Sequence, residues 1–163
     1  MSPEYRQLLT LKHSQDSWGG AGKSHADEIV AFADALGAIT ILDYGCGRGT
    51  LKPAIAPRAV VEYDPGIPGK DHLPEQCDLL IATDVLEHIE PDRLDAVLSH
   101  MRGLCRCGAF FVIALSLSRV ILPDGNNSHL IIRSPEWWLE KLNVAGFKIE
   151  RSELRKGLFV WAR

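Results

Sequence analysis

Three glycines and two carboxylates form the clearest chemical pattern in the sequence. The apolar segment 39–44 contains Asp43 and leads directly into Gly45, Gly47 and Gly49. Glycine lets the backbone turn tightly and approach a ligand closely. A second apolar segment, 60–64, ends on Asp64. Because ligands of open α/β sheets bind at the carboxyl ends of the strands, we expect both carboxylates to face the glycine turn.

The types of these residues indicate what the turn could bind. A fingerprint for binding a dinucleotide would place glycine at position 50, which holds Thr50, so a nicotinamide-dependent dehydrogenase is disfavoured. The carboxylate of Asp43 would repel a pyrophosphate, which is also an anion, so this position suits a cationic ligand better. Asp64 can accept both hydroxyl groups of a ribose. Each feature alone also fits a plain strand-to-helix turn or an Asp-Pro turn.

Alternating apolar strands and amphipathic helices must position these residues. The pattern predicts strands at 39–44, 60–64, 78–83 and 109–115, followed by a hairpin that includes 147–149 and 158–160. It predicts helices at 2–12, 24–36, 91–104 and 135–144, the second capped by Ser24. Residues 13–23 are expected to form a mobile loop, and residues 116–133 a long polar connection. This order predicts an α/β fold: an open, mostly parallel sheet with helices on both faces and a C-terminal antiparallel hairpin.

Composition and charge limit the class of protein. The 163 residues fit one domain, 1–163, in which residues 1–24 supply the N-terminal helix and a mobile lid loop. A net charge of −3 argues against tight nonspecific binding of nucleic acid. Residues 102–163 nevertheless hold ten Lys and Arg against five Asp and Glu, which fits either a mildly basic face or solvated charges. Four cysteines without a CxxC pair predict reduced thiols, and the N-terminus lacks a secretory core, so a cytoplasmic location without a membrane span is expected.

Taken together, the motifs resemble those of class I S-adenosylmethionine-dependent methyltransferases over residues 39–150. The resemblance is carried, in order, by ILDYGCGRGTL, VVEYDP, CDLLIATDVLEHI, GAFFVIALS and EWWLEKLNVAGFKI. It implies a Rossmann-like fold, a methyltransferase activity and S-adenosylmethionine as the cofactor. It also implies that Gly45, Gly47 and Gly49 border the cofactor, that Asp43 holds its methionine end and that Asp64 binds its ribose. Beside the cofactor would lie Thr83, Asp84, Val85 and Leu86.

One segment departs from that family. Only residues 65–77 separate the second strand from the third, where the family has room for a helix and a further strand. Four prolines and glycines near its start make a helix unfavourable there. A short loop must then build the adenine pocket, with Asp71, His72 and Leu73 as its candidate contacts.

The resemblance requires a group that activates the methyl acceptor. An acceptor hydroxyl must lose its proton, and histidine is suited to take it near pH 7. His88 follows the third strand, and His129 lies in the polar connection, so both are candidate bases. We expect O-methylation of a small polar or nucleotide-sized acceptor, enclosed by residues 13–23 with Trp18 and by residues 116–130. The segment after the third strand lacks the Asn/Asp-Pro-Pro-aromatic motif typical of enzymes that methylate base amino groups.

Two alternatives remain open. The segment DVLEHIEPDRL also resembles metal-assisted RNA 3′-terminal 2′-O-methyltransferases, in which two acids and two histidines bind a divalent ion. The corresponding ligands here would be Asp84, Glu87, His88 and His129. Aspartate stands where that family has its first glutamate, no RNA-binding domain is attached, and capping acids with hydrogen-bonded histidines would explain the same residues, so no metal is the first expectation. The other alternative is a regulatory module that binds the cofactor without catalysis.

Overall fold

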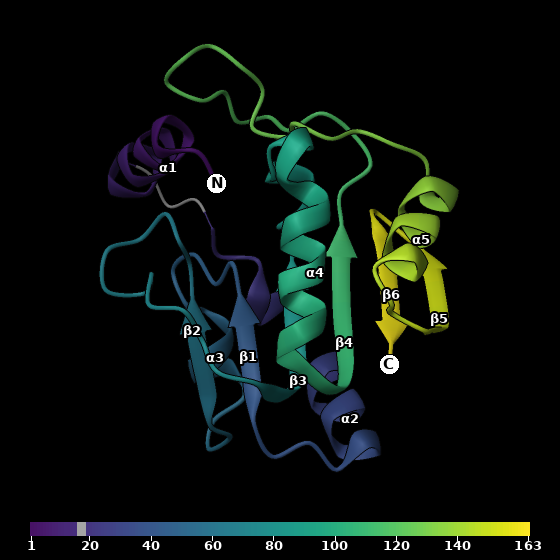
Figure 1. Ribbon diagram of the computed structural model, residues 1–163. Helices are drawn as coiled ribbons and strands as arrows, with labels where there is room; N and C mark the ends of the chain where they lie inside the picture. The colour runs from purple at the N-terminus through teal and green to yellow at the C-terminus, as the bar shows by residue number, and fades with distance from the viewer. Residues whose placement is uncertain (16–18) are drawn as a thin grey trace.

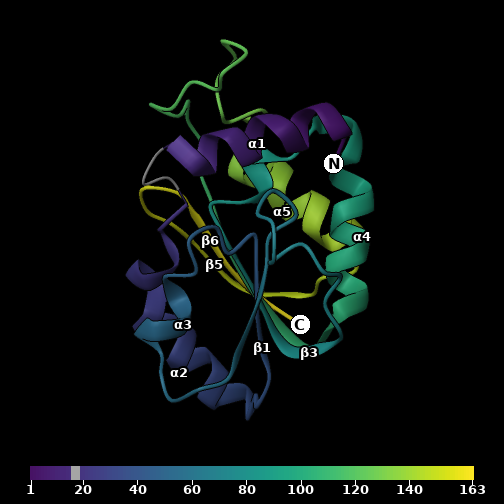
Figure 2. The same ribbon diagram turned by 90° about the vertical axis from the view of Figure 1, so that its left-hand side faces the viewer.

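The computed structural model describes residues 1–15 and 19–163 as a six-stranded sheet with helices on both faces (Figures 1 and 2). The strands are β1 (Ile41–Tyr44), β2 (Val60–Tyr63), β3 (Cys77–Thr83), β4 (Cys105–Ile113), β5 (Ile149–Leu154) and β6 (Leu158–Ala162). The α-helices are α1 (Pro3–Gln15), α2 (Ala26–Leu36), α3 (Leu51–Ala54), α4 (Leu94–Leu104) and α5 (Pro135–Val144). Short 3-10 turns are η1 (Gly22–His25), η2 (Leu86–His88) and η3 (Pro91–Arg93).

The strand order is β2-β1-β3-β4-β6-β5. The first four strands are parallel, and β6 pairs antiparallel with both β4 and β5. This topology confirms the predicted α/β fold with a C-terminal antiparallel hairpin. The carboxyl ends of β1, β2 and β3 therefore meet at one edge of the sheet, which is where the predicted functional residues lie.

Each face of the sheet buries its own apolar cluster. Successive strand residues point to opposite faces, so Phe111 packs with α4 and α5, whereas Phe110 packs with α2. The predicted core positions of α4 are buried, apart from Val97, which is partly exposed. On α5, Trp138 is fully buried, and Trp137 lies between the cationic groups of flanking side chains. These two tryptophans therefore pack the helix rather than offering a free surface for stacking.

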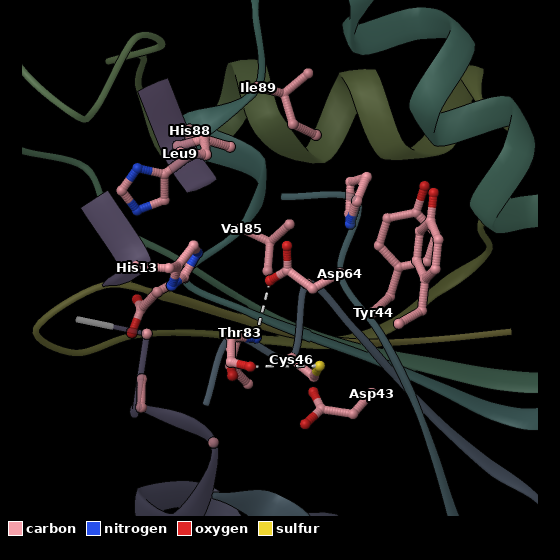
Figure 3. A pocket seen from close by; sticks show the side chains of 18 of the residues that line it. Leu9, His13, Asp43, Tyr44, Cys46, Asp64, Thr83, Val85, His88 and Ile89 are labelled. Carbon is pink, nitrogen blue, oxygen red and sulfur yellow. Dashed lines mark hydrogen bonds between the residues drawn. The ribbon is translucent and has the colours of Figure 1, made fainter. Parts of the chain in front are cut away.

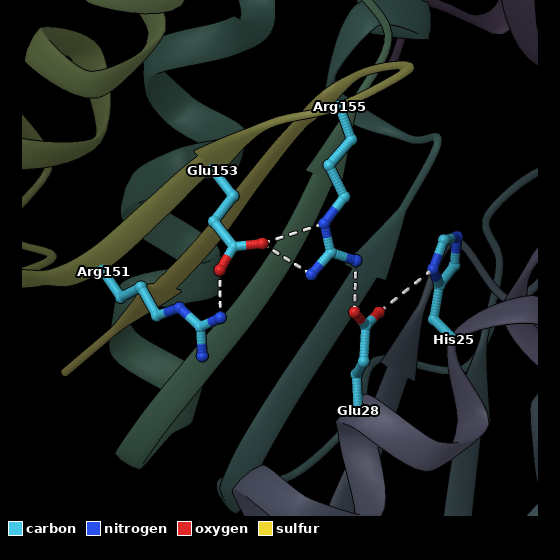
Figure 4. A network of polar contacts seen from close by, with 5 residues as sticks. All are labelled: His25, Glu28, Arg151, Glu153 and Arg155. Carbon is cyan, nitrogen blue, oxygen red and sulfur yellow. Dashed lines mark hydrogen bonds and ion pairs between the residues drawn. The ribbon is translucent and has the colours of Figure 1, made fainter.

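A network of ion pairs links α2 to the hairpin (Figure 4). Glu28 of α2 pairs with Arg155, which also donates to Glu153 at 2.8 Å through its Nε. Glu153 pairs in turn with Arg151, and His25 lies 3.6 Å from Glu28. Exposed ion pairs contribute little to the free energy of unfolding. The main effect of this network is therefore to hold the hairpin in its orientation against α2.

The structure corrects several predicted boundaries near the N-terminus. The first helix continues to Gln15, so residues 13–15 are helical rather than part of a loop. Ser24 lies inside η1 and does not cap α2, which begins at Ala26 after His25 without a side-chain cap. Residues 16–18, including the predicted lid residue Trp18, lie outside the described residues.

Two further boundaries differ because of strand pairing. The fourth strand begins at Cys105, opposite Cys77, instead of at Ala109, and it ends at Ile113. Gly108 lies inside this strand, at a position where a Cβ would come within 2.5 Å of the side chain of Leu36. The short helix α3 was not predicted. The expected absence of a helix between β2 and β3 agrees with the turns found there, and β2 is the terminal strand of the sheet.

Two further features of the described residues are the state of the cysteines and the length of the helices. Cys46, Cys77 and Cys105 are buried free thiols, and Cys107 is an exposed one. Among the described residues, no helix has both the length and the apolar composition needed to span a bilayer.

We predict that Phe111→Ala lowers the free energy of unfolding by about 3–5 kcal/mol, because it opens a cavity in the cluster beneath α4 and α5. Phe111 is fully buried and meets the ring of Phe147 edge-on at 5.0 Å. Urea denaturation followed by circular dichroism measures the change. Val61→Ala, at a side chain that is 54% exposed on β2, should change it by less than about 0.5 kcal/mol. Equal effects of the two substitutions would contradict this description of the core.

Candidate active site

A cavity of about 490 Å³ opens at the carboxyl ends of β1, β2 and β3 (Figure 3). Its wall comes from α1, from residues 19–22, from the glycine turn after β1, and from the segments that follow β2 and β3. Residues of the connection between β4 and α5 complete it. Its size and its position at the strand ends are typical of a small-molecule site in an open α/β sheet.

The glycine turn is closely packed on two sides. Gly45 and Gly47 have φ values of 75° and 51°, which other residues rarely adopt. A Cβ on Gly45 would come within 2.6 Å of Val85, and a Cβ on Gly47 within 2.4 Å of the carbonyl oxygen of Gly19. The turn therefore needs glycine both for its conformation and for the close approach of two other segments.

Asp64 lines the cavity and joins two turns (Figure 3). Its Oδ2 accepts a hydrogen bond from the backbone N–H of Gly47 at 2.9 Å, and its Oδ1 accepts one from Gly66 at 2.9 Å. The side chain belongs to a residue that is only 6% exposed. Each carboxylate oxygen still has a second lone pair with which it can accept a hydrogen bond from a ligand.

Asp43 is a buried carboxyl beside a second acid. Strand register places it next to Glu62 of β2, and Glu62 in turn lies 3.4 Å from Lys70. Burial, reinforced by Glu62 and opposed by Lys70, raises the pKa of Asp43 to about 7. Glu62 was not singled out from the sequence, although its place opposite Asp43 on the next strand could have revealed it.

The backbone is unusual immediately after β3. Asp84 has a φ of 54°, the only positive value among the described residues other than glycine. Its N–H is held by the carbonyl oxygen of Val112 at 2.9 Å. Burial raises the pKa of the Asp84 carboxyl, and His25 and His129 partly oppose this effect. The left-handed conformation of Asp84 turns the chain along the wall of the cavity, which is lined by Thr83, Asp84 and Val85.

The two candidate bases lie side by side in the cavity wall. The rings of His88 and His129 meet edge-on with centroids 4.8 Å apart. The Nδ1 of His88 is 2.6 Å from the carbonyl oxygen of Ser128, and that of His129 is 2.6 Å from that of Ser116. A carbonyl oxygen can only accept a hydrogen bond, so Nδ1 carries the hydrogen in both rings and Nε2 is the basic nitrogen. Burial lowers the pKa of His88 to about 4.

Glu87 holds the connection after β4 against this pair. Its Oε1 accepts a hydrogen bond from the N–H of Ala114, and its backbone oxygen accepts from Leu130 and Ile131. The side chain is fully buried, and its Oε2 has no hydrogen-bond partner among the described residues. Burial raises the pKa of Glu87 to about 8. A ligand atom of Glu87 lies within 4.8 Å of ligand atoms of His88 and His129, whereas Asp84 is not part of this group.

Five predicted cofactor contacts lie outside the cavity wall: Gly49, Asp71, His72, Leu73 and Leu86. Leu86 is fully buried in the core, and Leu73 is 77% exposed. Gly49 faces the carboxylate of Glu62, which would be 1.8 Å from an added Cβ. Asp71 lies 3.8 Å from Arg6 of α1, and His72 is exposed to solvent. The tight turn between β2 and β3 directs Asp71 towards α1, so this loop contributes only Pro65 beyond Asp64 to the wall.

Helix α1 covers the opening between the two histidine-bearing segments and β2 (Figures 2 and 3). The hydroxyl of Tyr5 donates to the carbonyl oxygen of His88 at 2.7 Å, and that of Thr10 donates to Gly66 at 2.8 Å. Leu9 and Tyr5 are buried against Leu122 of the connection after β4. The helix is thus attached to both sides of the cavity.

Comparisons with known proteins show which fold this is. The sequence matches no protein-family model, and a comparison with curated proteins also finds no match. Among solved structures, the 1,6-didemethyltoxoflavin-N1-methyltransferase of Burkholderia thailandensis, solved with S-adenosylhomocysteine, superposes with a TM-score of 0.71 at 21% identity. That alignment covers 100% of this chain and 90% of the other.

Two further structures give the same result. The magnesium protoporphyrin IX methyltransferase of Synechocystis PCC 6803, solved with S-adenosylmethionine, has a TM-score of 0.64 and 17% identity over 98% of this chain and 94% of its own. The mitomycin 7-O-methyltransferase MmcR has a TM-score of 0.67 and 17% identity over 95% of this chain and 60% of its own. The chain therefore has the Rossmann-like fold of class I methyltransferases.

We predict that Asp43→Asn stabilises the protein increasingly as pH rises from 4 to 7. The folded protein keeps this carboxyl protonated up to about pH 7, whereas the unfolded chain ionises it near 3.8, so ionisation favours unfolding between these values. Asparagine cannot ionise, and its advantage over the wild type should grow by roughly 3 kcal/mol across this range. Urea denaturation at several pH values measures it.

Asp95→Asn, at an exposed carboxylate on α4, provides the control and should show little dependence on pH. An advantage of Asp43→Asn that stayed constant from pH 4 to pH 8 would refute the assignment of Asp43 as a buried acid.

Proposed function

We propose that the protein is an S-adenosylmethionine-dependent methyltransferase that acts on an oxygen atom of a small polar acceptor. The observation that carries the proposal is the position of the cavity, which joins the glycine turn to Asp43 and Asp64 at the strand ends. The fold supports it, because two of the similar structures were solved with S-adenosylmethionine or S-adenosylhomocysteine. Residues 1–163 would act as one domain, with α1 and residues 116–130 excluding water from the reaction.

The residues divide into those for the cofactor and those for the chemistry. Gly45 and Gly47 allow the cofactor to approach the backbone, Asp43 faces its cationic methionine end, and Asp64 accepts from its ribose hydroxyls. Along the opposite side of the cofactor lie Thr83, Asp84 and Val85. Gly49, Asp71 and His72 take no direct part in this proposal, since they lie outside the cavity.

The reaction needs alignment and a proton acceptor. The acceptor oxygen attacks the methyl carbon, the bond from that carbon to the sulfonium sulfur breaks, and S-adenosylhomocysteine leaves. The hydroxyl proton passes to Nε2 of an imidazole. His129 is the better base of the two, because burial lowers the pKa of His88 to about 4 and makes it a weak proton acceptor. His88 then acts on the position of His129 through their edge-on contact.

Calorimetric titration with S-adenosylmethionine tests the cofactor assignment. We expect micromolar binding that weakens about 10- to 100-fold in Asp64→Ala, because the ribose hydroxyls lose their acceptor. Because Asp64→Ala also removes the acceptor of Gly47 and Gly66, urea denaturation of the variant shows whether the weaker binding comes with disruption of the two turns. Asp71→Ala, which removes a carboxylate of the same loop outside the cavity, should change the affinity less than threefold. Absence of heat at high micromolar cofactor would rule out the proposed function.

A second candidate is methyl transfer assisted by a divalent ion, as in RNA 2′-O-methylation. The specific observation in its favour is the grouping of Glu87, His88 and His129, in which the buried Oε2 of Glu87 has no hydrogen-bond partner within residues 1–15 and 19–163. One carboxylate and two imidazole nitrogens fit Mn²⁺ better than Mg²⁺, which prefers oxygen ligands. The ion would polarise the acceptor oxygen and ease loss of its proton.

Electron paramagnetic resonance of added Mn²⁺ tests this candidate without any acceptor. If the group binds the ion, His129→Gln should weaken Mn²⁺ binding at least tenfold, because one ligand is lost, while Asp95→Asn leaves it unchanged. Failure of millimolar Mn²⁺ to bind the wild-type protein would exclude the metal site. The imidazoles would then be left as bases only.

A further inference from the structure

Acidic side chains line the cavity together with three histidines. Four carboxylates line it: Asp43, Asp64, Asp84 and Glu90. Among the described residues of the wall, none is a lysine or an arginine. Burial raises the pKa of Asp43 to about 7 and also raises that of Asp84, so the preference of the cavity for cations over anions rests on Asp64 and Glu90.

Two of these carboxylates face the cofactor in the function proposed above. Asp43 and Asp64 flank the glycine turn, so a bound sulfonium nucleoside would occupy them. Asp84 and Glu90 belong instead to the segment after β3, which also carries His88. Because Asp84 also lies along the cofactor in that function, Glu90 is the carboxylate that is left to contact the acceptor.

Glu90 lies where α1 covers the cavity. Its Oε2 accepts a hydrogen bond from the N–H of Ser2 at 2.7 Å. Glu90 also lies close to Tyr5. Burial of the Tyr5 phenol is the main cause of its raised pKa, and the charge of Glu90 is the second cause. Ile89 and Val97 bring apolar surface to the same wall. A carboxylate beside apolar side chains matches a ligand that has a cationic group on an apolar body.

We propose that the methyl acceptor is a small amphipathic amine, in which a hydroxyl group receives the methyl and a protonated amino group is recognised by Glu90. This proposal rests on the methyltransferase function proposed above and names its acceptor class. Glu90 determines specificity by contact with the ammonium group. The hydroxyl proton goes to His129, and the products are a methyl ether and S-adenosylhomocysteine.

The same charges disfavour acceptors that carry phosphate or carboxylate groups. The basic residues of the last third of the chain do not change this, because they lie elsewhere. Arg151 and Arg155 are engaged with acids in the hairpin network (Figure 4), and neither lines the cavity. The basic face expected from the charge distribution is therefore not available to the acceptor site.

Three phenols with the same body test the proposal. Tyramine, 4-propylphenol and 3-(4-hydroxyphenyl)propionate differ only in whether the tail ends in an ammonium, a methyl or a carboxylate group. Each is titrated calorimetrically into protein saturated with S-adenosylhomocysteine. We expect tyramine to bind at least tenfold more tightly than the propionate, with 4-propylphenol between them. In Glu90→Gln this ratio should fall below threefold, whereas Asp95→Asn should keep it.

The outcomes separate the two proposals. If S-adenosylhomocysteine itself does not bind, the methyltransferase function fails, and the acceptor class fails with it. If it binds but the three phenols bind equally, the propionate binds most tightly or none of them binds, only the acceptor class is overturned. Tighter binding of adenosine monophosphate than of adenosine to the saturated protein would also overturn it, because a phosphate would then be favoured.

Discussion

The cavity depends on one carboxylate, that of Asp64, which holds two backbone turns together. The backbone oxygen of Tyr63, at the end of β2, already accepts hydrogen bonds from the N–H groups of Gly45 and Cys46, and Asp64 extends this link beyond the strands. Asp64 accepts from the N–H groups of Gly47 and Gly66 and so joins the turn after β1 to the turn after β2. Buried N–H groups need acceptors, and one side chain here serves two of them. The floor of the site is therefore set before any ligand arrives.

Glu87 plays the corresponding part on the other side of the cavity. Its side chain binds Ala114 at the end of β4, and its backbone oxygen binds Leu130 and Ile131. These contacts bring a connection that contains a single isolated β-bridge, between Ile121 and Asn127, back to the sheet. The position of His129 beside His88 follows from them. Burial raises the pKa of the Glu87 side chain, and the nearby charge of Asp84 raises it further.

The sequence was sufficient for the fold, because apolar runs and helical spacing mark the strands and helices whichever way their loops turn. It placed Asp43 and Asp64 at the strand ends for the same reason. It could not place Asp71, whose direction depends on a contact with Arg6 from a distant helix. Glu62 was missed as well, because it becomes a neighbour of Asp43 only through the register of β1 and β2, which has to be assumed before the sequence can indicate the pair. Long-range contacts, rather than local preferences, account for what was missed.

Strand β2 lies at the edge of the sheet, where another molecule could pair with it, and its sequence makes such aggregation less favourable. A strand at the edge of a sheet exposes unpaired N–H and C=O groups, on which a strand of another molecule can assemble. Here that strand has four residues, and one of them is the charged Glu62, held by Lys70. So short and charged an edge is a poor template for aggregation, and the sheet can end here without an outer strand to shield it.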